Sequence, residues 1–256
     1  MRRAAIWLGT IATVTTLALP ASALAAEVLT ASPSLAGTAG GPGLLTIKAG
    51  VVDSLGGVPS PLTQLAIDIP PGVTYNFDTT PVCSINAITA ATGTTPPVCP
   101  TGSKIGSGSS SVEAVLGSVT INETASLDIY LLQRSPVKYE VWANGVTPIE
   151  ETLTFPGTFT PTAAPFAEKI LVNIPPIPTV EGGPDASVTS LDFTVGGNHT
   201  VTTTKKKHGK KSVTHTTVGL FDLPKNCTSS VQLPYAATAS FSDGSTVPIT
   251  GKVACP

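Results

Sequence analysis

The sequence predicts an all-β protein, folded as an antiparallel β-sandwich of roughly a dozen strands after an N-terminal signal peptide. Apolar and polar residues alternate in short runs, and helical spacing of apolar residues is nearly absent. Gly, Pro, Asn, Asp and Ser separate these runs, and glycine and proline contribute 24 residues each. Many short strands divided by turn residues are typical of a sandwich.

The chain opens with the features of a secretory signal peptide, residues 1–25. Arg2 and Arg3 precede the apolar run 4–19, and the Ala-x-Ala triplet 23–25 is a cleavage signal. The apolar run contains threonines and falls short of the roughly 20 residues that a retained transmembrane helix needs. We therefore expect a protein that is secreted or associated with the cell envelope and that folds in an oxidising compartment.

Charge and hydropathy limit the partners of the remaining chain, residues 26–256. Loss of the two leader arginines turns 14 basic residues into 12 against 16 acidic ones, a net charge of about −4. This charge is too mild to indicate a nucleic acid partner. No later apolar stretch is long enough to span a bilayer. We expect one β-sandwich domain, with a subdivision near Arg134 as the alternative.

The first predicted strands, 43–52 and 62–69, alternate apolar and polar residues. Pro70-Pro71-Gly72 ends the second, because proline removes a donor from the ladder. Val, Ile and Thr, which favour extended backbone, dominate the next strands together with Leu. These are expected at residues 112–116, 119–121, 125–132, 138–142 and 151–155.

The second half of the chain continues the same pattern. The strand 167–174 ends at Pro175-Pro176, again because proline cannot donate to a ladder. Asp243-Gly244 is a hairpin turn signal between the last two strands, since glycine accepts a positive φ. The remaining strands are expected at residues 187–195, 200–204, 212–221, 235–242 and 246–253.

All four cysteines lie after the leader, and an even number in an exported chain favours disulfides. Four cysteines allow three pairings. We predict the sequential one, Cys83–Cys99 and Cys227–Cys255, because each pair then lies within one local excursion or terminal hairpin. No Cys-x-x-Cys spacing occurs and every histidine is distant in sequence, so no metal and no cofactor are expected.

Five lysines, Lys205, Lys206, Lys207, Lys210 and Lys211, crowd seven positions. Only 7 basic residues then remain against 16 acidic ones in the rest of the chain after the leader. This loop could hold a polyanion such as a teichoic acid or a heparin-like chain. The alternative is a solvated loop that keeps an exposed strand edge from pairing with other chains.

The turn within this lysine-rich segment decides where two histidines lie. If His208-Gly209 is a two-residue turn, His215 pairs with Thr202 and His199 with Val218, on opposite faces of the ribbon. An odd-length turn centred on His208 would place both histidines on one face. Only that second register could begin a metal site.

Trp142 is the only tryptophan after the leader, and it lies close to Tyr139. In the strand 138–142, Tyr139 and Val141 share one face, whereas Glu140 and Trp142 share the other. A solvated face would expose Trp142 as a carbohydrate-binding platform with Tyr139 nearby. The alternative is a tryptophan in the core of the sandwich.

Signatures of catalysis are poor. Neither His-Glu-x-x-His nor Gly-x-Ser-x-Gly occurs, and the Ser-x-x-Lys match at residues 135–138 leads into a strand instead of a helix. Glu150 and Glu151 are adjacent, so in a strand they point to opposite faces and do not form an acid/base pair. The sequence indicates no catalytic residue and favours a non-catalytic protein.

The chain contains, in this order, the segments Ile67–Val73, Cys99–Gly108, Leu223–Cys227 and Phe241–Ser245. Together these segments resemble a group of uncharacterised secreted proteins from high-GC Gram-positive bacteria. The chain departs from the group at Thr228, where a proline is expected after the cysteine. The resemblance implies an immunoglobulin-like, non-catalytic exported fold and brings no catalytic residues.

We therefore expect a secreted or envelope-associated, non-catalytic β-sandwich protein with a structural or binding role. One alternative is a carbohydrate-binding or carbohydrate-active module that uses Trp142 and Tyr139. The other is a surface polyanion binder that uses the lysines between 205 and 211. The partner classes are a cell-wall glycan or another envelope polyanion.

Overall fold

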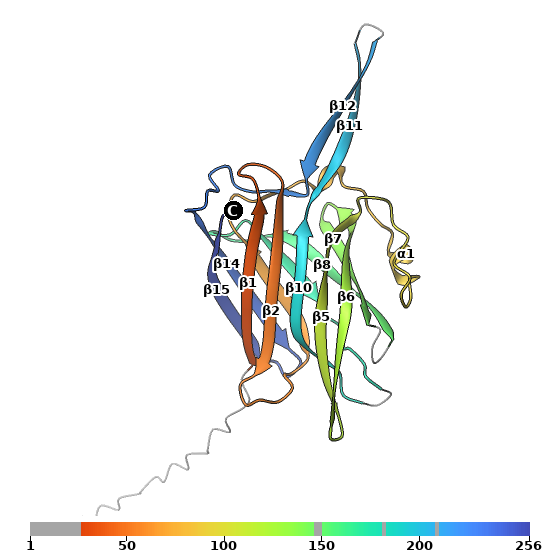
Figure 1. Cartoon of the computed structure of the whole chain (residues 1–256), viewed down its shortest axis with the longest axis vertical. Coiled ribbons are helices and arrows are strands. Elements are labelled where there is room, and N and C mark those ends of the chain that lie inside the picture. Colours follow the sequence, from red (N-terminus) through yellow and green to blue (C-terminus); the bar gives the residue numbers. More distant parts are fainter. Residues whose placement is uncertain (1–26, 146–149, 181–182, 208–209) are drawn as a thin grey trace, which may run out of the picture.

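The structure, a computed structural model, describes residues 27–145, 150–180, 183–207 and 210–256. The predicted signal peptide and His208 lie outside these residues. Within them the protein is all-β and antiparallel, with fifteen strands, one short α-helix and one 3-10 turn (Figure 1). In the described part of the chain, no helix is long and apolar enough to cross a membrane.

Eleven strands form one sheet. They are β1 (Glu27–Gly37), β2 (Gly43–Asp53), β3 (Leu62–Ile69), β5 (Lys104–Leu116), β6 (Val119–Arg134), β7 (Val137–Gly145), β8 (Glu151–Pro161), β9 (Glu168–Asn173), β10 (Ser187–Gly196), β14 (Gln232–Phe241) and β15 (Thr246–Ala254). Their order is β1-β2-β10-β5-β6-β7-β8-β9-β3-β14-β15. The sheet runs without a break through Arg134, where a subdivision was the alternative expectation.

Smaller elements complete the fold. The pair β4 (Thr74–Tyr75) and β13 (Phe221–Asp222) and the pair β11 (Asn198–Lys207) and β12 (Lys210–Gly219) are both antiparallel. The 3-10 turn η1 is Phe77–Thr79, and the helix α1 is Ile85–Thr89.

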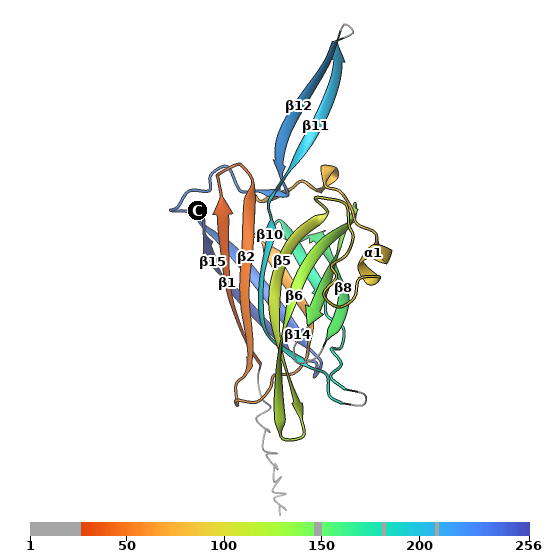
Figure 2. The same cartoon turned by 45° about the vertical axis from the view of Figure 1, so that its right-hand side comes forward.

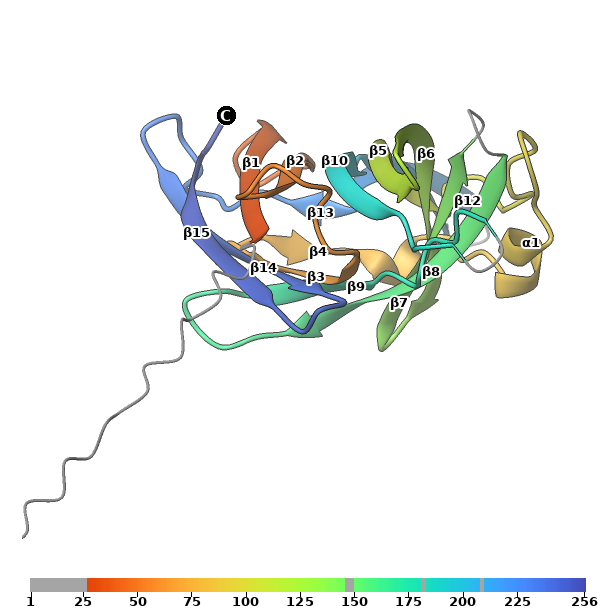
Figure 3. The same ribbon diagram turned by 90° about the horizontal axis from the view of Figure 1, so that it is seen from below.

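The expected two-sheet sandwich, including its immunoglobulin-like form, is wrong. The eleven strands instead curl round until the sheet nearly closes into a barrel (Figures 2 and 3). Its edge strands β1 and β15 lie close together but form no backbone ladder in the described residues. The Tyr235 hydroxyl on β14 donates to the carbonyl of Ala31 on β1 at 3.2 Å, across this seam. Alternation predicts a buried face, and one curled sheet provides it as well as two packed sheets do.

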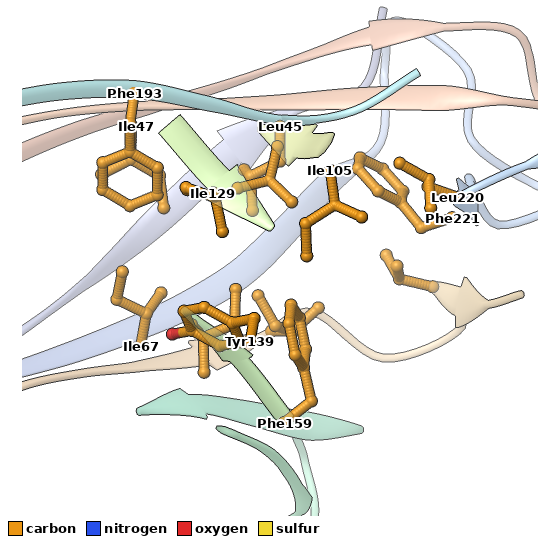
Figure 4. Packing of buried hydrophobic residues seen from close by; sticks show 14 of the residues in the cluster. Leu45, Ile47, Ile67, Ile105, Ile129, Tyr139, Phe159, Phe193, Leu220 and Phe221 are labelled. Atoms are coloured by element: carbon orange, nitrogen blue, oxygen red, sulfur yellow. The ribbon is translucent and has the colours of Figure 1, made fainter. Parts of the chain in front are cut away.

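The hydrophobic core fills much of the space inside the curled sheet. Ile47 and Phe193 on one wall point toward Tyr139 and Phe159 on the other (Figure 4). The rings of Tyr139 and Phe159 meet edge to face, with their centroids 5.3 Å apart. Burying a side chain of this size stabilises the fold by about 1.5–3 kcal/mol.

Glycine allows close packing where two strands meet inside the core. Gly108 on β5 pairs with Phe193 on β10. A Cβ at Gly108 would collide with the Asp192 carbonyl oxygen and the Phe193 backbone. The Gly- and Ser-rich first half of β5 is therefore a strand because of its neighbour, although its own residues disfavour one.

Both predicted disulfides are present. Cys83 pairs with Cys99 and Cys227 with Cys255, at Cα–Cα distances of 5.2 and 5.3 Å. The first closes an excursion, residues 83–99, that contains α1 and packs outside β6 and β7 (Figure 2). The second joins the end of β15 to the chain that leads into β14.

Candidate functional site

The hairpin β11–β12 projects from one end of the curled sheet (Figures 1 and 2). Its ladder pairs Thr202 with His215 and His199 with Val218, so the register predicted for a two-residue turn is confirmed. The two histidines therefore lie on opposite faces of the ribbon. The His199 Nε2 is 2.8 Å from the Thr79 hydroxyl, which ties the base of the hairpin to η1.

Beyond this base, solvent surrounds the hairpin. Its two strands form a sheet of their own, so neither strand has an outer neighbour in a ladder. Between residues 202 and 217, all side chains that the structure describes are exposed. Leu220 N donates to Gly197 O at 2.9 Å, which closes the ribbon where it leaves the body.

The lysines gather at the far end of this ribbon. Lys206 pairs with Lys211 and Lys207 with Lys210, while Lys205 pairs with Ser212. The side chains of Lys206 and Lys211 are exposed. Like charges directly opposite each other destabilise a strand pair. No acidic residue occurs in the whole hairpin, residues 198–219, to offset this repulsion.

The two aromatic candidates are buried and lie on opposite sides of the sheet wall. Trp142 is 4% exposed, in an outer cluster with Cys83, Ile88 and Tyr130 beneath the excursion. Tyr139 is 2% exposed inside the sheet. Trp142 thus belongs to a core, the second of the two interpretations that the sequence left open, and neither ring is an exposed platform.

Sequence reasoning missed a pair of carboxyl groups. Glu123 on β6 and Glu151 on β8 flank the end of β7 at Gly145, with both carboxyl groups half-buried. Burial, and then the charge of Glu151, raise the pKa of Glu123, and burial raises the pKa of Glu151. Alternation along β6 contained a signal, because it places Glu123 on the same inward face as Leu127.

These carboxyl groups line the rim of a cavity inside the sheet. Its volume is about 100 Å³, and its walls are almost entirely apolar. Ser110 is the other polar side chain at this end of the cavity, and its hydroxyl donates to Ser190 O at 3.0 Å.

In the described part of the chain, no group of three or more His, Cys, Asp or Glu side chains is arranged to hold a metal ion. A comparison of the chain with protein-family models, curated proteins and solved structures finds no match.

Proposed function

We propose that the protein is an exported, non-catalytic binding protein that attaches to anionic polymers of the cell envelope through β11–β12. The observation that carries this proposal is the lysine-rich end of a ribbon that projects from the body and contains no acidic residue. The two disulfides are consistent with an extracellular location, because such bonds persist in oxidising compartments.

The distance between the lysines and the body supports this role. Outside the hairpin, 7 basic residues face 16 acidic ones in residues 26–256, so the body itself repels a polyanion. Each hairpin strand has 10 residues, and at roughly 3.3 Å per residue the ribbon extends about 30 Å. The Debye length at physiological salt is about 8 Å. The field of the acidic body is therefore largely screened at the tip, where the lysines can attract a polyanion.

The direct pairing of lysines across the hairpin also supports the proposal. Directly opposed lysines cost stability unless a ligand compensates their repulsion. A hairpin whose only task was to protect its edges would need fewer charges, spread along both strands. An anionic polymer with closely spaced phosphates or sulfates would neutralise several of these lysines together.

The carbohydrate alternative has no comparable support. Trp142 lies under the disulfide-closed excursion and Tyr139 inside the sheet. A sugar ring could stack on Trp142 only after the excursion had moved away.

Retention on immobilised heparin and on immobilised lipoteichoic acid tests the proposal. Each lysine near an anionic surface contributes about 1 kcal/mol, so changing all five to glutamine should weaken binding roughly four-thousandfold at low salt. Changing them to arginine should preserve retention, because the charge is kept. Circular dichroism should show that the body of each variant is unchanged.

A matched pair of double variants separates the hairpin from general surface charge. Lys206→Gln with Lys211→Gln should lower the salt concentration needed for elution. Lys225→Gln with Lys252→Gln removes two exposed charges from the body and should leave elution nearly unchanged. Equal effects of the two pairs, or full retention of the five-glutamine variant, would contradict the proposal.

A further inference from the structure

The cavity inside the curled sheet is only partly enclosed. Near the buried end, Ile105, Ile129 and Phe159 line it and are almost inaccessible. Toward Glu123 and Glu151, apolar side chains that line the cavity are only half-buried. These half-buried side chains are Val112, Leu153, Phe155, Val172, Ile177 and Leu191.

The open end lies away from the lysine hairpin. Val112 pairs with both Glu123 and Val188, so the carboxyl groups lie where β10 begins. The hairpin follows the other end of β10, after Gly196. The cavity and the hairpin are therefore independent features at opposite ends of the molecule.

Protein interiors are normally filled to crystal-like density. Inward-facing apolar side chains that keep contact with solvent thus leave a favourable burial unused. An apolar cavity of about 150 Å³ in another protein stays dry and binds benzene. The cavity of about 100 Å³ here has room for the end of an alkyl chain. The open side would let the rest of the chain run past Leu153 and Leu191.

The rim decides which head group fits. The cavity is lined by no lysine, arginine or histidine among the described residues, whereas Glu123 and Glu151 stand at its open end. The Glu123 Oε1 is buried and has no hydrogen-bond partner among the described groups. A carboxylate head would meet like charge there, while an ammonium head would supply the missing donor.

We infer that the curled sheet binds a single-chain amphiphile with an amine head, its alkyl chain in the cavity and its ammonium group between Glu123 and Glu151. This ligand site is separate from the polyanion surface of the proposed function. Each can fail without the other, because the amphiphile touches no residue of the hairpin.

Calorimetry with decylamine, decanol and decanoate, each below its micelle concentration, tests the inference on the purified protein. Decylamine should bind most tightly, decanol about tenfold more weakly, and decanoate not measurably. Decylamine should also displace the neutral fluorescent probe N-phenyl-1-naphthylamine. Absence of decylamine binding at millimolar concentration, or equal binding of decanoate, would overturn it.

Variants locate the binding. Leu191→Phe fills the cavity and should abolish the binding of both decylamine and decanol. If Leu191→Phe does not fold, Leu153→Phe fills the same cavity and takes its place in the test. Glu123→Gln with Glu151→Gln should weaken decylamine about tenfold and leave decanol unchanged. The control Glu113→Gln removes a half-buried carboxylate from the neighbouring strand β5, outside the cavity, and should change neither. Unchanged decylamine binding in the filled variant, or an equal effect of Glu113→Gln, would refute the assigned site.

Discussion

The Cys83–Cys99 disulfide closes a loop with a sequence separation of 16, and its removal should destabilise the protein by about 3 kcal/mol. This value is the conformational entropy that the unfolded chain loses when the crosslink closes the loop, expressed as a free energy. For Cys227–Cys255, with a separation of 28, the same relation yields about 3.6 kcal/mol. The entropy account thus ranks the C-terminal disulfide slightly above the one that holds the excursion.

Urea unfolding of the variants C83A/C99A and C227A/C255A measures both losses. Trp142 is the only tryptophan of residues 27–256 and packs beneath the excursion, so its fluorescence reports on that region directly. Circular dichroism follows the sheet. We expect coincident transitions and unchanged native emission, because Ile88 and Tyr130 continue to cover the indole in C83A/C99A.

The opposite ranking would refute the entropy account. If C83A/C99A lost clearly more stability and its native emission shifted to the red, the disulfide would be needed to hold the excursion against the folded sheet. A loss below about 1 kcal/mol for both variants would contradict the reasoning altogether, because either loop should contribute more than that.

Four further substitutions, at three positions, test the packing of the sheet wall. Trp142→Ala should cost about 3–5 kcal/mol because it leaves a cavity beneath the excursion, whereas Trp142→Phe should cost less because it keeps an aromatic ring there. Both substitutions remove a buried indole N–H that has no partner among the described residues, which offsets part of each cost. Urea unfolding measures both. A Cβ at Gly157 would collide with the ring of Tyr139, so Gly157→Ala should cost about 1–3 kcal/mol by the same assay. Burial raises the pKa of Glu140 above its usual 4.5, although a hydrogen bond with Thr154 acts against this. A raised carboxyl pKa stabilises the fold at low pH and loses that contribution as the pH rises from 4.5 through the folded-state pKa. Glu140→Gln should therefore reduce the fall of the melting temperature over this pH range, and an unchanged profile would contradict the assignment.

Strand positions could be predicted where one face is buried and the other is solvated. The predicted strand 62–69 has the bounds of β3, since Leu and Ile alternate there up to the prolines. The strand β1 was missed because it is an edge strand that contains Pro33 and small residues. The first half of β5 was missed because its glycines lie where the neighbouring strand β10 approaches closely, with Gly108 opposite Phe193.

The number of sheets could not be predicted in the same way. Alternation is a local property, whereas the order of strands depends on pairings between distant segments. The strand β10, for example, lies between β2 and β5. The pattern of each strand is the same in a sandwich and in a single curled sheet.

The candidate sites likewise differ in whether they depend on residues close in sequence or on contacts between distant segments. The disulfides depend on residues close in sequence, and their pairing was predicted correctly. For β11–β12 the sequence left two registers open, and the structure has the one that belongs to a two-residue turn. Glu123 and Glu151 lie near each other only because β6 and β8 flank β7 in the sheet. In the sequence, the carboxylate next to Glu151 is Glu150, so no local pattern reveals the proximity of Glu123. The cover over Trp142 likewise comes from an excursion whose position no local pattern reveals.

The strand order also determines when the fold can be completed. The central strands β5 to β9 pair with their neighbours in sequence, so they can form early, with little loop entropy to overcome. The N-terminal strands differ, because β2 must wait for β10, and β3 for β9 and β14. A chain that emerges from its N-terminus can form the β1–β2 hairpin first, but the other edge of β2 and both edges of β3 stay unpaired until the later strands have appeared. The complete sheet is therefore one of the last features that a growing chain can acquire, because β2 and β3 join the central strands only through β9, β10 and β14.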